Sequence, residues 1–309
     1  MKIGLVDLDT SHPGAFVPLL RERGHEVVGV WDGGSVHPSG YAEQFARENQ
    51  IPKVFETLDG MREEVDCAII HACDWDTHVE KVRCFLDADK SVLVDKPIAG
   101  NAKDLDRFVA WVDEGRRLAG GSALLYCEEA EEWKRSKTDD RGELLTVYGG
   151  CGVDAFNYGI HAYAMAMAFV DHAPVKSVRY IDSAGSQDVI ELVYENGVRA
   201  MLQIGITEAW LPFYGTLVTT RKVHPFLVRT DRIYARFLDA ILPFLSGESD
   251  VPPLSGDRLV QSERCALAVL ISKQSGGRSV TIAETCETSL SYDGSAFAES
   301  YRTMKYPDL

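Results

Sequence analysis

The first 120 residues alternate between short apolar runs and longer segments in which apolar residues recur every three or four positions. Short apolar runs are typical of strands buried on both faces, and the longer period is typical of helices. The pattern predicts strands at 2–6, 26–32, 53–55, 67–73, 91–97 and 120–126. It predicts helices at 15–25, 39–49, 58–65, 75–89 and 102–118. Strands that alternate with helices indicate an α/β domain with a doubly wound parallel sheet.

From about residue 143 the strands follow one another more directly. The pattern predicts strands at 143–153, 175–185, 188–194, 198–206 and within 215–230, and helices at 157–170, 231–245 and 259–275. Asn196-Gly197 is a typical tight hairpin turn between two of these strands. We therefore expect a second domain of the α+β class with a mostly antiparallel sheet. The two domains should cover residues 1–122 and 123–309.

Composition excludes several classes of protein. The formal net charge of −15 over 309 residues repels phosphate backbones, so nucleic acid is not an expected partner. The seven cysteines include no Cys-x-x-Cys pair, which indicates reduced thiols and no structural metal site. The chain contains no apolar run of about 18 residues and starts directly with a strand pattern. We expect a cytoplasmic protein without membrane contact.

The stretch "VDLDTSHPGAF", residues 6–16, joins the first strand to the first helix. Dinucleotide-binding proteins carry three glycines here, but this chain has Asp7 and Asp9 at the first two places and His12 near the third. A carboxylate facing pyrophosphate costs about 1 kcal/mol in water and more when buried. The N–H groups of a helix start still favour anions. One interpretation is a phosphate site, and the other is a helix start capped by Asp9. The candidate cofactor contacts are Asp9, Thr10, Ser11 and His12.

Asp32 ends the second predicted strand, about 20 residues beyond this turn. An acidic residue there accepts hydrogen bonds from the ribose hydroxyls of NAD. No Arg or Lys follows within 33–40, so a 2′-phosphate would lack a counter-charge. This favours NAD over NADP. The alternative is that Asp32 only begins a turn before Gly33-Gly34.

The segment "HACDWDTHVEKV", residues 71–82, leaves a strand and enters a helix, with Asp76 or Thr77 as its expected N-cap. Loops of this kind line the ligand-binding edge of a doubly wound sheet. Its His, Cys and Asp residues are dense, but their spacing fits no standard metal site. The candidate cofactor contacts in this segment are Cys73, Asp74 and His78.

Two further stretches contain candidate catalytic residues. Lys96 follows a buried strand, where its ammonium group can orient a substrate hydroxyl and share in proton transfer. The alternative is a surface pair with Asp95. In "DAFNYGIHAYAMAMAF" the spacing places Asn157, Tyr158 and His161 on one helical surface, with Asp154 a turn earlier. His161 is then a candidate general base.

These stretches together resemble the glucose–fructose oxidoreductase/inositol dehydrogenase (Gfo/Idh/MocA) superfamily. The resemblance rests on "IIHACDWDTHVEKVRCFLDADKSVLVDKPIA", "NYGIHAYAM" and "ALAVLISKQSGGRSVTI". It implies an N-terminal Rossmann domain and a C-terminal open-faced sheet that binds substrate and forms a homodimer or homotetramer. It also implies NAD-dependent hydride transfer at a hydroxyl or ketone carbon of a sugar, cyclitol or related polyol. By motif match Lys96 is the active-site lysine, His161 assists proton transfer, and Asp95 and Lys96 contact the cofactor.

Three features depart from the family: the missing glycines, a short chain, and Asn157 in place of an aspartate. Without a carboxylate partner, His161 should have a pKa near 6.5 or below. Two alternatives stay open at this point. One is an NAD-retaining glycosidase or lyase that works by transient oxidation. The other is a non-catalytic sensor or scaffold on the same fold.

Overall fold

A computed structural model describes residues 1–171 and 173–307 of the chain. Its N-terminal sheet has five parallel strands in the order β2-β1-β3-β4-β5. The strands are β1 Lys2–Val6, β2 Glu26–Trp31, β3 Cys67–Ile70, β4 Ser91–Val94 and β5 Leu118–Gly120. The helices between them are α1 His12–Glu22, α2 Tyr41–Glu48, α3 Leu58–Arg62, the 3₁₀ turn η1 Trp75–Thr77, α4 His78–Leu86 and α5 Ala102–Asp113. The predicted doubly wound Rossmann architecture is confirmed.

Two of the predicted strands are wrong. The last parallel strand is β5, and the predicted strand at 120–126 is instead a 3₁₀ turn, η2, at Ala123–Tyr126. Ser122 caps that turn by accepting a hydrogen bond from the Leu124 N–H, which favours a turn over an extended strand. The predicted strand at 53–55 is a single bridge between Val54 and Val30.

The C-terminal sheet has seven strands in the order β11-β10-β6-β9-β8-β7-β12. They are β6 Leu144–Gly152, β7 Val175–Ala184, β8 Gln187–Tyr194, β9 Arg199–Gly205, β10 Leu211–Thr219, β11 Val223–Leu227 and β12 Val280–Thr281. Only the β6–β9 pairing among them is parallel, so the mostly antiparallel prediction is confirmed. Asn196-Gly197 does form the β8–β9 turn, with Gly197 at φ 85°.

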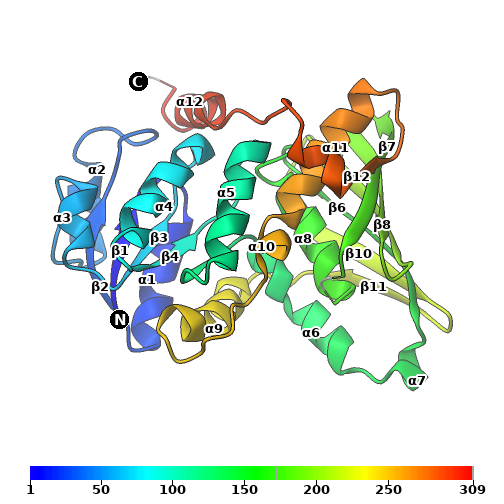
Figure 1. Cartoon of the computed structure of the whole chain (residues 1–309), viewed down its shortest axis with the longest axis horizontal. Helices are drawn as coiled ribbons and strands as arrows, with labels where there is room; N and C mark the ends of the chain where they lie inside the picture. Colours follow the sequence, from blue (N-terminus) through cyan, green and yellow to red (C-terminus); the bar gives the residue numbers. More distant parts are fainter. Residues whose placement is uncertain (172, 308–309) are drawn as a thin grey trace.

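Helices lie on one side of this second sheet (Figure 1). They are α8 Gly159–Phe169, α10 Gly256–Leu259 and α11 Gln261–Gln274. Ten of the eleven residues of α8 are buried. The Ala/Met run of α8 is therefore core packing between the sheet and the rest of the molecule.

The remaining helical segments lie between β5 and β6 or after β11. They are α6 Glu128–Arg135, α7 Thr138–Arg141, α9 Ile233–Leu245, the 3₁₀ turn η3 Ile282–Cys286 and α12 Gly294–Lys305. The sequence pattern did not predict α6, α7 or α12. Helix α9 packs against α1, and α12 packs against η1, so late segments of the chain return to the first sheet. Figure 1 shows α12 (red) lying across one end of that sheet.

Within the described residues, no helix is both long and apolar enough to cross a bilayer.

Candidate functional site

The turn after β1 keeps the backbone shape of a glycine turn without the glycine. Asp7 has φ 60°, the left-handed region that glycine adopts most easily. Its Oδ1 accepts the Gly33 N–H at 3.0 Å, and its Oδ2 lies 2.6 Å from Lys81 Nζ. These two partners hold a conformation that costs about 1–2 kcal/mol for most residues. Lys81 also neutralises the first of the two acids that the sequence places near the phosphate position.

Asp9 occupies the place of the second glycine and is fully buried. Its Oδ2 accepts the Cys73 N–H at 2.7 Å, so it ties the β1 turn to the loop after β3. The expectation that Asp9 caps α1 is therefore wrong; Ser11 takes the cap position, without a side-chain hydrogen bond. Burial, with the charge of Asp7 nearby, raises the pKa of Asp9 to about 7. Near pH 7 Asp9 is therefore only partly ionised, and Asp7 is paired with Lys81, so the turn carries less negative charge than two free carboxylates would.

Asp9→Asn should therefore change stability in a pH-dependent way. Because the folded protein raises the Asp9 pKa from 3.8 to about 7, ionisation disfavours the folded state progressively across that window. Relative to wild type, the variant should gain about 2–4 kcal/mol in unfolding free energy between pH 4.5 and pH 8. Urea unfolding at both pH values measures this gain. The exposed Asp113→Asn is the matched control, and an Asp9→Asn gain no larger than that of the control would contradict the assignment.

Asp32 lies at the end of β2, as predicted, and is half-buried. Its Oδ1 accepts the Gly34 N–H at 2.6 Å, and its Oδ2 accepts the Leu8 N–H at 3.2 Å. A carboxylate has lone pairs left for ribose hydroxyls after these two bonds. The guanidinium of Arg302, on α12, donates to the Gly34 carbonyl at 3.4 Å. A basic side chain therefore does stand near Asp32, which corrects the premise that none is available to a 2′-phosphate.

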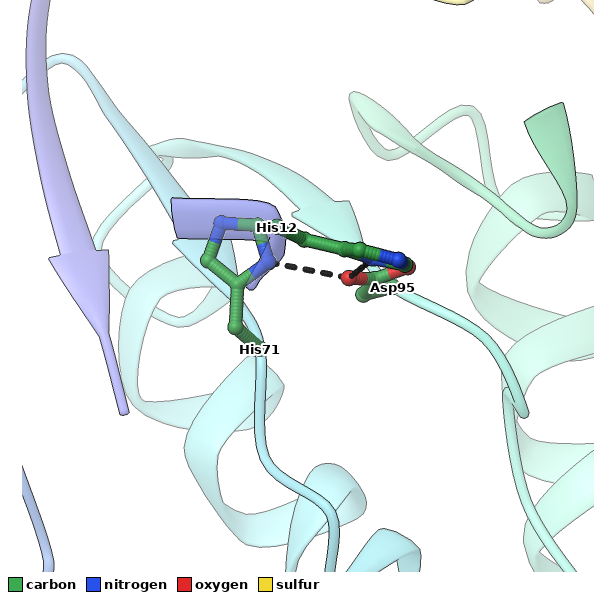
Figure 2. Close-up of side chains that lie close together, drawn as sticks. All are labelled: His12, His71 and Asp95. Carbon is green, nitrogen blue, oxygen red and sulfur yellow. Dashed lines mark hydrogen bonds and ion pairs between the residues drawn. The ribbon is translucent and has the colours of Figure 1, made fainter. Parts of the chain in front are cut away.

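His12, His71 and Asp95 form a buried cluster at the ends of β3 and β4 (Figure 2). Asp95 Oδ2 lies 2.5 Å from His12 Nδ1 and 3.0 Å from His71 Nδ1. Burial alone would raise the pKa of Asp95, but the two imidazoles hold it well below its usual value. Asp95 Oδ1 accepts the backbone N–H of Lys96 at 2.9 Å. Asp95 therefore serves the two histidines, and the alternative of an Asp95–Lys96 surface pair is wrong.

This cluster also has the residue types of a metal site, with its three ligand atoms within 4.8 Å of one another. Ligands around a tetrahedral zinc ion, each about 2.0–2.1 Å from the metal, lie roughly 3.3 Å apart. The separations of 2.5 and 3.0 Å are instead those of charge-assisted hydrogen bonds. We interpret the cluster as a hydrogen-bond network that orients His12.

Lys96 is nearly buried and points away from Asp95 toward the start of α8. Its Nζ donates to the backbone carbonyl and to Oδ1 of Asn157, each at 3.1 Å, and lies 5.5 Å from the centre of the Tyr158 ring. Two of its three donors are thus used and one is free. Burial lowers the pKa of Lys96. A lysine held in this way can give a proton to, or orient, a substrate oxygen.

His161 lies in the first turn of α8, half-buried, with its Nδ1 2.7 Å from Ser122 Oγ. Burial, with the positive charges of Lys96 and His12 nearby, lowers its pKa well below 6.5, as the missing carboxylate predicts. In the tautomer that donates Nδ1–H to Ser122, Nε2 keeps its lone pair. His161 can then accept a proton.

The predicted helical surface at 154–161 is wrong in part. Helix α8 begins at Gly159, so Asn157 and Tyr158 precede it. Asp154 accepts the N–H groups of Phe156 and Tyr158 in the turn before the helix, and does not partner His161. The tyrosine nevertheless joins the two candidate groups, because its ring lies 5.4 Å from that of His161.

Most polar side chains of the loop after β3 form hydrogen bonds within the protein and are not available to a ligand. Thr77 is the N-cap residue of α4, as expected, although its side chain makes no capping hydrogen bond. Asp74 caps the preceding turn η1 by accepting the Asp76 N–H. Cys73 is buried in a small cluster with Val36 and Ala298. His78 is fully buried, and its ring nitrogens lie 3.0 and 3.2 Å from the carbonyls of Ile98 and Ala72. This leaves His78 without an accessible atom for a cofactor.

Sequence reasoning missed several residues of the site. The sequence pattern places Ser122 in a strand and offers His71 only as a possible metal ligand. Lys81 sits in a helix whose amphipathic pattern gave no sign of a partner 74 positions earlier. The contacts of Arg302 and Lys305 required α12, which the pattern did not predict.

Comparison with protein families finds one match. The sequence model of the Gfo/Idh/MocA family, described as an oxidoreductase family with an NAD-binding Rossmann fold, matches residues 12–119. A search of curated proteins finds no matching sequence.

Solved structures share the fold over nearly the whole chain at low sequence identity. A probable dehydrogenase from Thermotoga maritima has a TM-score of 0.76 and 14% identity, and the match covers 92% of this chain and 100% of that one. The scyllo-inositol dehydrogenase from Lactobacillus casei, solved with NAD(H) and scyllo-inositol, has a TM-score of 0.75 and 12% identity, with 92% and 99% covered. GenD2 from gentamicin A biosynthesis, solved with NAD, has a TM-score of 0.74 and 14% identity, with 91% and 96% covered.

Proposed function

Because residues 12–119 belong to the Gfo/Idh/MocA oxidoreductase family with its NAD-binding Rossmann fold, we propose that the whole chain is an NAD-dependent oxidoreductase. Its substrate is a sugar, cyclitol or related polyol, oxidised at a hydroxyl carbon or formed by reduction of the ketone. The observation that carries this proposal is the placement of Lys96 and His161 around the Tyr158 ring. The similarity to a scyllo-inositol dehydrogenase supports the substrate class.

The residues at the ends of β1 and β2 fit a dinucleotide in charge and in position. Asp7 is paired with Lys81, Asp9 is only partly ionised at pH 7 because its pKa is raised to about 7, and both carboxylates are buried. The start of α1 then offers its N–H groups, with the Thr10 and Ser11 side chains beside them, to a diphosphate. Asp32 would hold the adenosine ribose. NAD, when bound, supplies the acceptor and donor of hydride.

The protein's own groups would handle the proton of the substrate hydroxyl. The free N–H of Lys96 would bind and polarise the substrate oxygen, while Asn157 fixes the direction of the ammonium group. His161, neutral because its pKa is lowered, would take the proton at Nε2 as the hydroxyl is oxidised. His12 is a second imidazole at the carboxyl edge of the first sheet. Unlike His161, it has an anionic partner, the Asp95 carboxylate.

A turnover screen tests this function. NAD⁺ is incubated with a panel of inositols, hexoses and uronic acids, and NADH formation is followed at 340 nm. We expect at least one member to give NADH at a rate that rises with pH as His161 loses its proton and then levels off near or below pH 6.5. If none does, and the matching ketones fail to oxidise NADH, the redox assignment is wrong.

The open face of the C-terminal sheet supports the further proposal of a homodimer or homotetramer. The large apolar side chains exposed on its strands, and just beyond β9, are Leu145, Tyr148, Ile181, Ile206, Val223 and Leu227. Apolar groups gathered on one sheet face are a typical interface. We expect Tyr148→Glu combined with Leu227→Glu to lower the mass seen by light scattering to that of one chain. A wild-type protein that is already monomeric at micromolar concentration would refute the proposal.

A further inference from the structure

Helix α12 lies over the part of the first sheet where a doubly wound fold binds its ligand. In the order β2-β1-β3, the chain moves outward on opposite sides of β1, which makes the carboxyl ends of β1 and β3 the switch point. Ligands of such folds bind outside these strand ends. The contacts of α12 fall on the turns that follow β1, β2 and β3, one after another.

Each of these turns meets a different part of the helix. Lys305 Nζ donates to the Asp9 carbonyl at 3.2 Å, and Arg302 donates to the Gly34 carbonyl. Ala298 packs on Val36 and Cys73, with Phe297 and Tyr301 beside them. At the start of the helix, the Gly294 N–H donates to Asp76 Oδ2 at 2.8 Å.

The contact at Asp9 is the most informative. In the usual dinucleotide-binding loop, the place of Asp9 is taken by the second glycine. That glycine lets the backbone approach the pyrophosphate closely. Here residues 7–9 are fully buried, and the carbonyl at position 9 already accepts a hydrogen bond from α12. A dinucleotide cannot reach this backbone while Lys305 and the helix stay where they are.

The helix is held by contacts that can be broken at modest cost. Only Gly294 and Ala298 of its twelve residues are buried. A hollow of about 540 Å³ opens between its exposed residues and the turns at Ser35 and Asp74. Elements with few buried apolar contacts open most easily.

The segment before the helix is anchored much more firmly. Tyr292 stacks on Phe156 with ring centres 4.0 Å apart, its N–H donates to the Gly100 carbonyl, and its carbonyl accepts the Trp75 Nε1–H. The chain therefore has a fixed point at 292 and a weakly packed helix directly after it. A rotation about 293 would uncover Asp9 and break the contacts of the helix with Val36 and Cys73, while Tyr292 stays in place.

We propose that α12 and the dinucleotide compete for one place, so that the coenzyme binds only when the helix swings away from the ends of β1–β3. This inference rests on the proposed function and adds its regulation: the affinity for NAD(H) is set by the fraction of molecules in which the helix is open. When only a fraction of molecules is competent, the observed Kd is the intrinsic Kd divided by that fraction.

The test weakens the helix contacts in the full chain and measures coenzyme binding. Arg302→Ala combined with Lys305→Ala removes two contacts to the β1 and β2 turns, and the matched control is Arg135→Ala with Lys137→Ala, two exposed residues near α6. NADH fluorescence titration should give a Kd about 3–10-fold lower for the α12 variant, and unchanged for the control. Weaker binding by the α12 variant would show that the helix helps to bind the coenzyme, and would overturn the proposal.

Hydrogen exchange gives a second readout that does not depend on any variant. Saturating NADH should speed exchange of the amides at 294–305 and slow exchange at 9–14 in the wild-type chain. Slower exchange in both segments would also overturn the proposal. Absence of NADH binding by wild type and by the α12 variant alike would instead refute the proposed function itself.

Discussion

Lys96→Met is expected to lower turnover by about 10²–10⁴-fold while NADH affinity stays within about threefold of wild type. Methionine fills a similar volume but removes the one ammonium group placed against Asn157 and Tyr158. Because that group acts on the substrate oxygen, its loss should fall on kcat more than on coenzyme binding. Steady-state rates at 340 nm, with the polyol that the turnover screen identifies, measure the effect.

Two comparisons make this expectation specific to the site. Lys103→Met removes the same charge from the exposed side of α5 and should leave turnover unchanged. Asn157→Asp places a carboxylate against the Lys96 ammonium group and should hold the lysine in its charged form. Turnover of Lys96→Met within threefold of wild type would remove the lysine from the mechanism.

Asp95→Asn is expected to destabilise the folded protein by about 3 kcal/mol at pH 7. The buried carboxylate of Asp95 forms hydrogen bonds with two imidazoles and one backbone N–H. An asparagine amide has only one acceptor oxygen and no negative charge, so it cannot replace all three bonds. Urea unfolding monitored by tryptophan fluorescence measures the loss.

The pH dependence of this loss follows from the direction of the pKa shift. The folded protein holds the Asp95 pKa well below its usual 3.8, so the carboxylate stabilises the fold above that value. The difference between wild type and Asp95→Asn should be constant from pH 8 to about pH 5 and shrink only as the pH falls below about 4. A difference absent at pH 7, or no larger than that of Asp113→Asn, would contradict the network in Figure 2.

The sequence pattern predicted the parallel sheet and the site lysine because both depend on local signals. Apolar runs such as "CAIIHAC" determine a buried strand, and residues that follow such strands meet at one edge of the sheet. The same local signals predict Asp32 and Lys96 at that edge. Their neighbours differ in this respect. Gly34 lies two positions from Asp32, in the turn that the sequence offers as an alternative, whereas Asn157 lies 61 positions from Lys96 in a loop whose course no local pattern specifies.

Helix α12 shows most clearly why the rest of the site could not be predicted. Only two of its residues are buried, so its sequence "GSAFAESYRTMK" lacks the apolar stripe that marks a helix packed on a core. Its contacts to Asp9 and Gly34 join residues more than 260 positions apart. The predicted start of α8 is wrong for another reason. The Asp154 carboxylate accepts N–H groups of the following residues in a local turn, which competes with the helix, and α8 begins only at Gly159.

The most direct measurement of the central claim is a fluorescence titration of the purified full chain with NADH and, separately, with NADPH. The account predicts saturable binding of NADH at the edge that contains Asp32, and binding at least tenfold weaker in Asp32→Ala. Glu80→Ala removes an exposed acidic side chain from α4, and this variant should bind NADH as wild type does. No binding of either nucleotide up to millimolar concentration, or equal binding by Asp32→Ala, would contradict it.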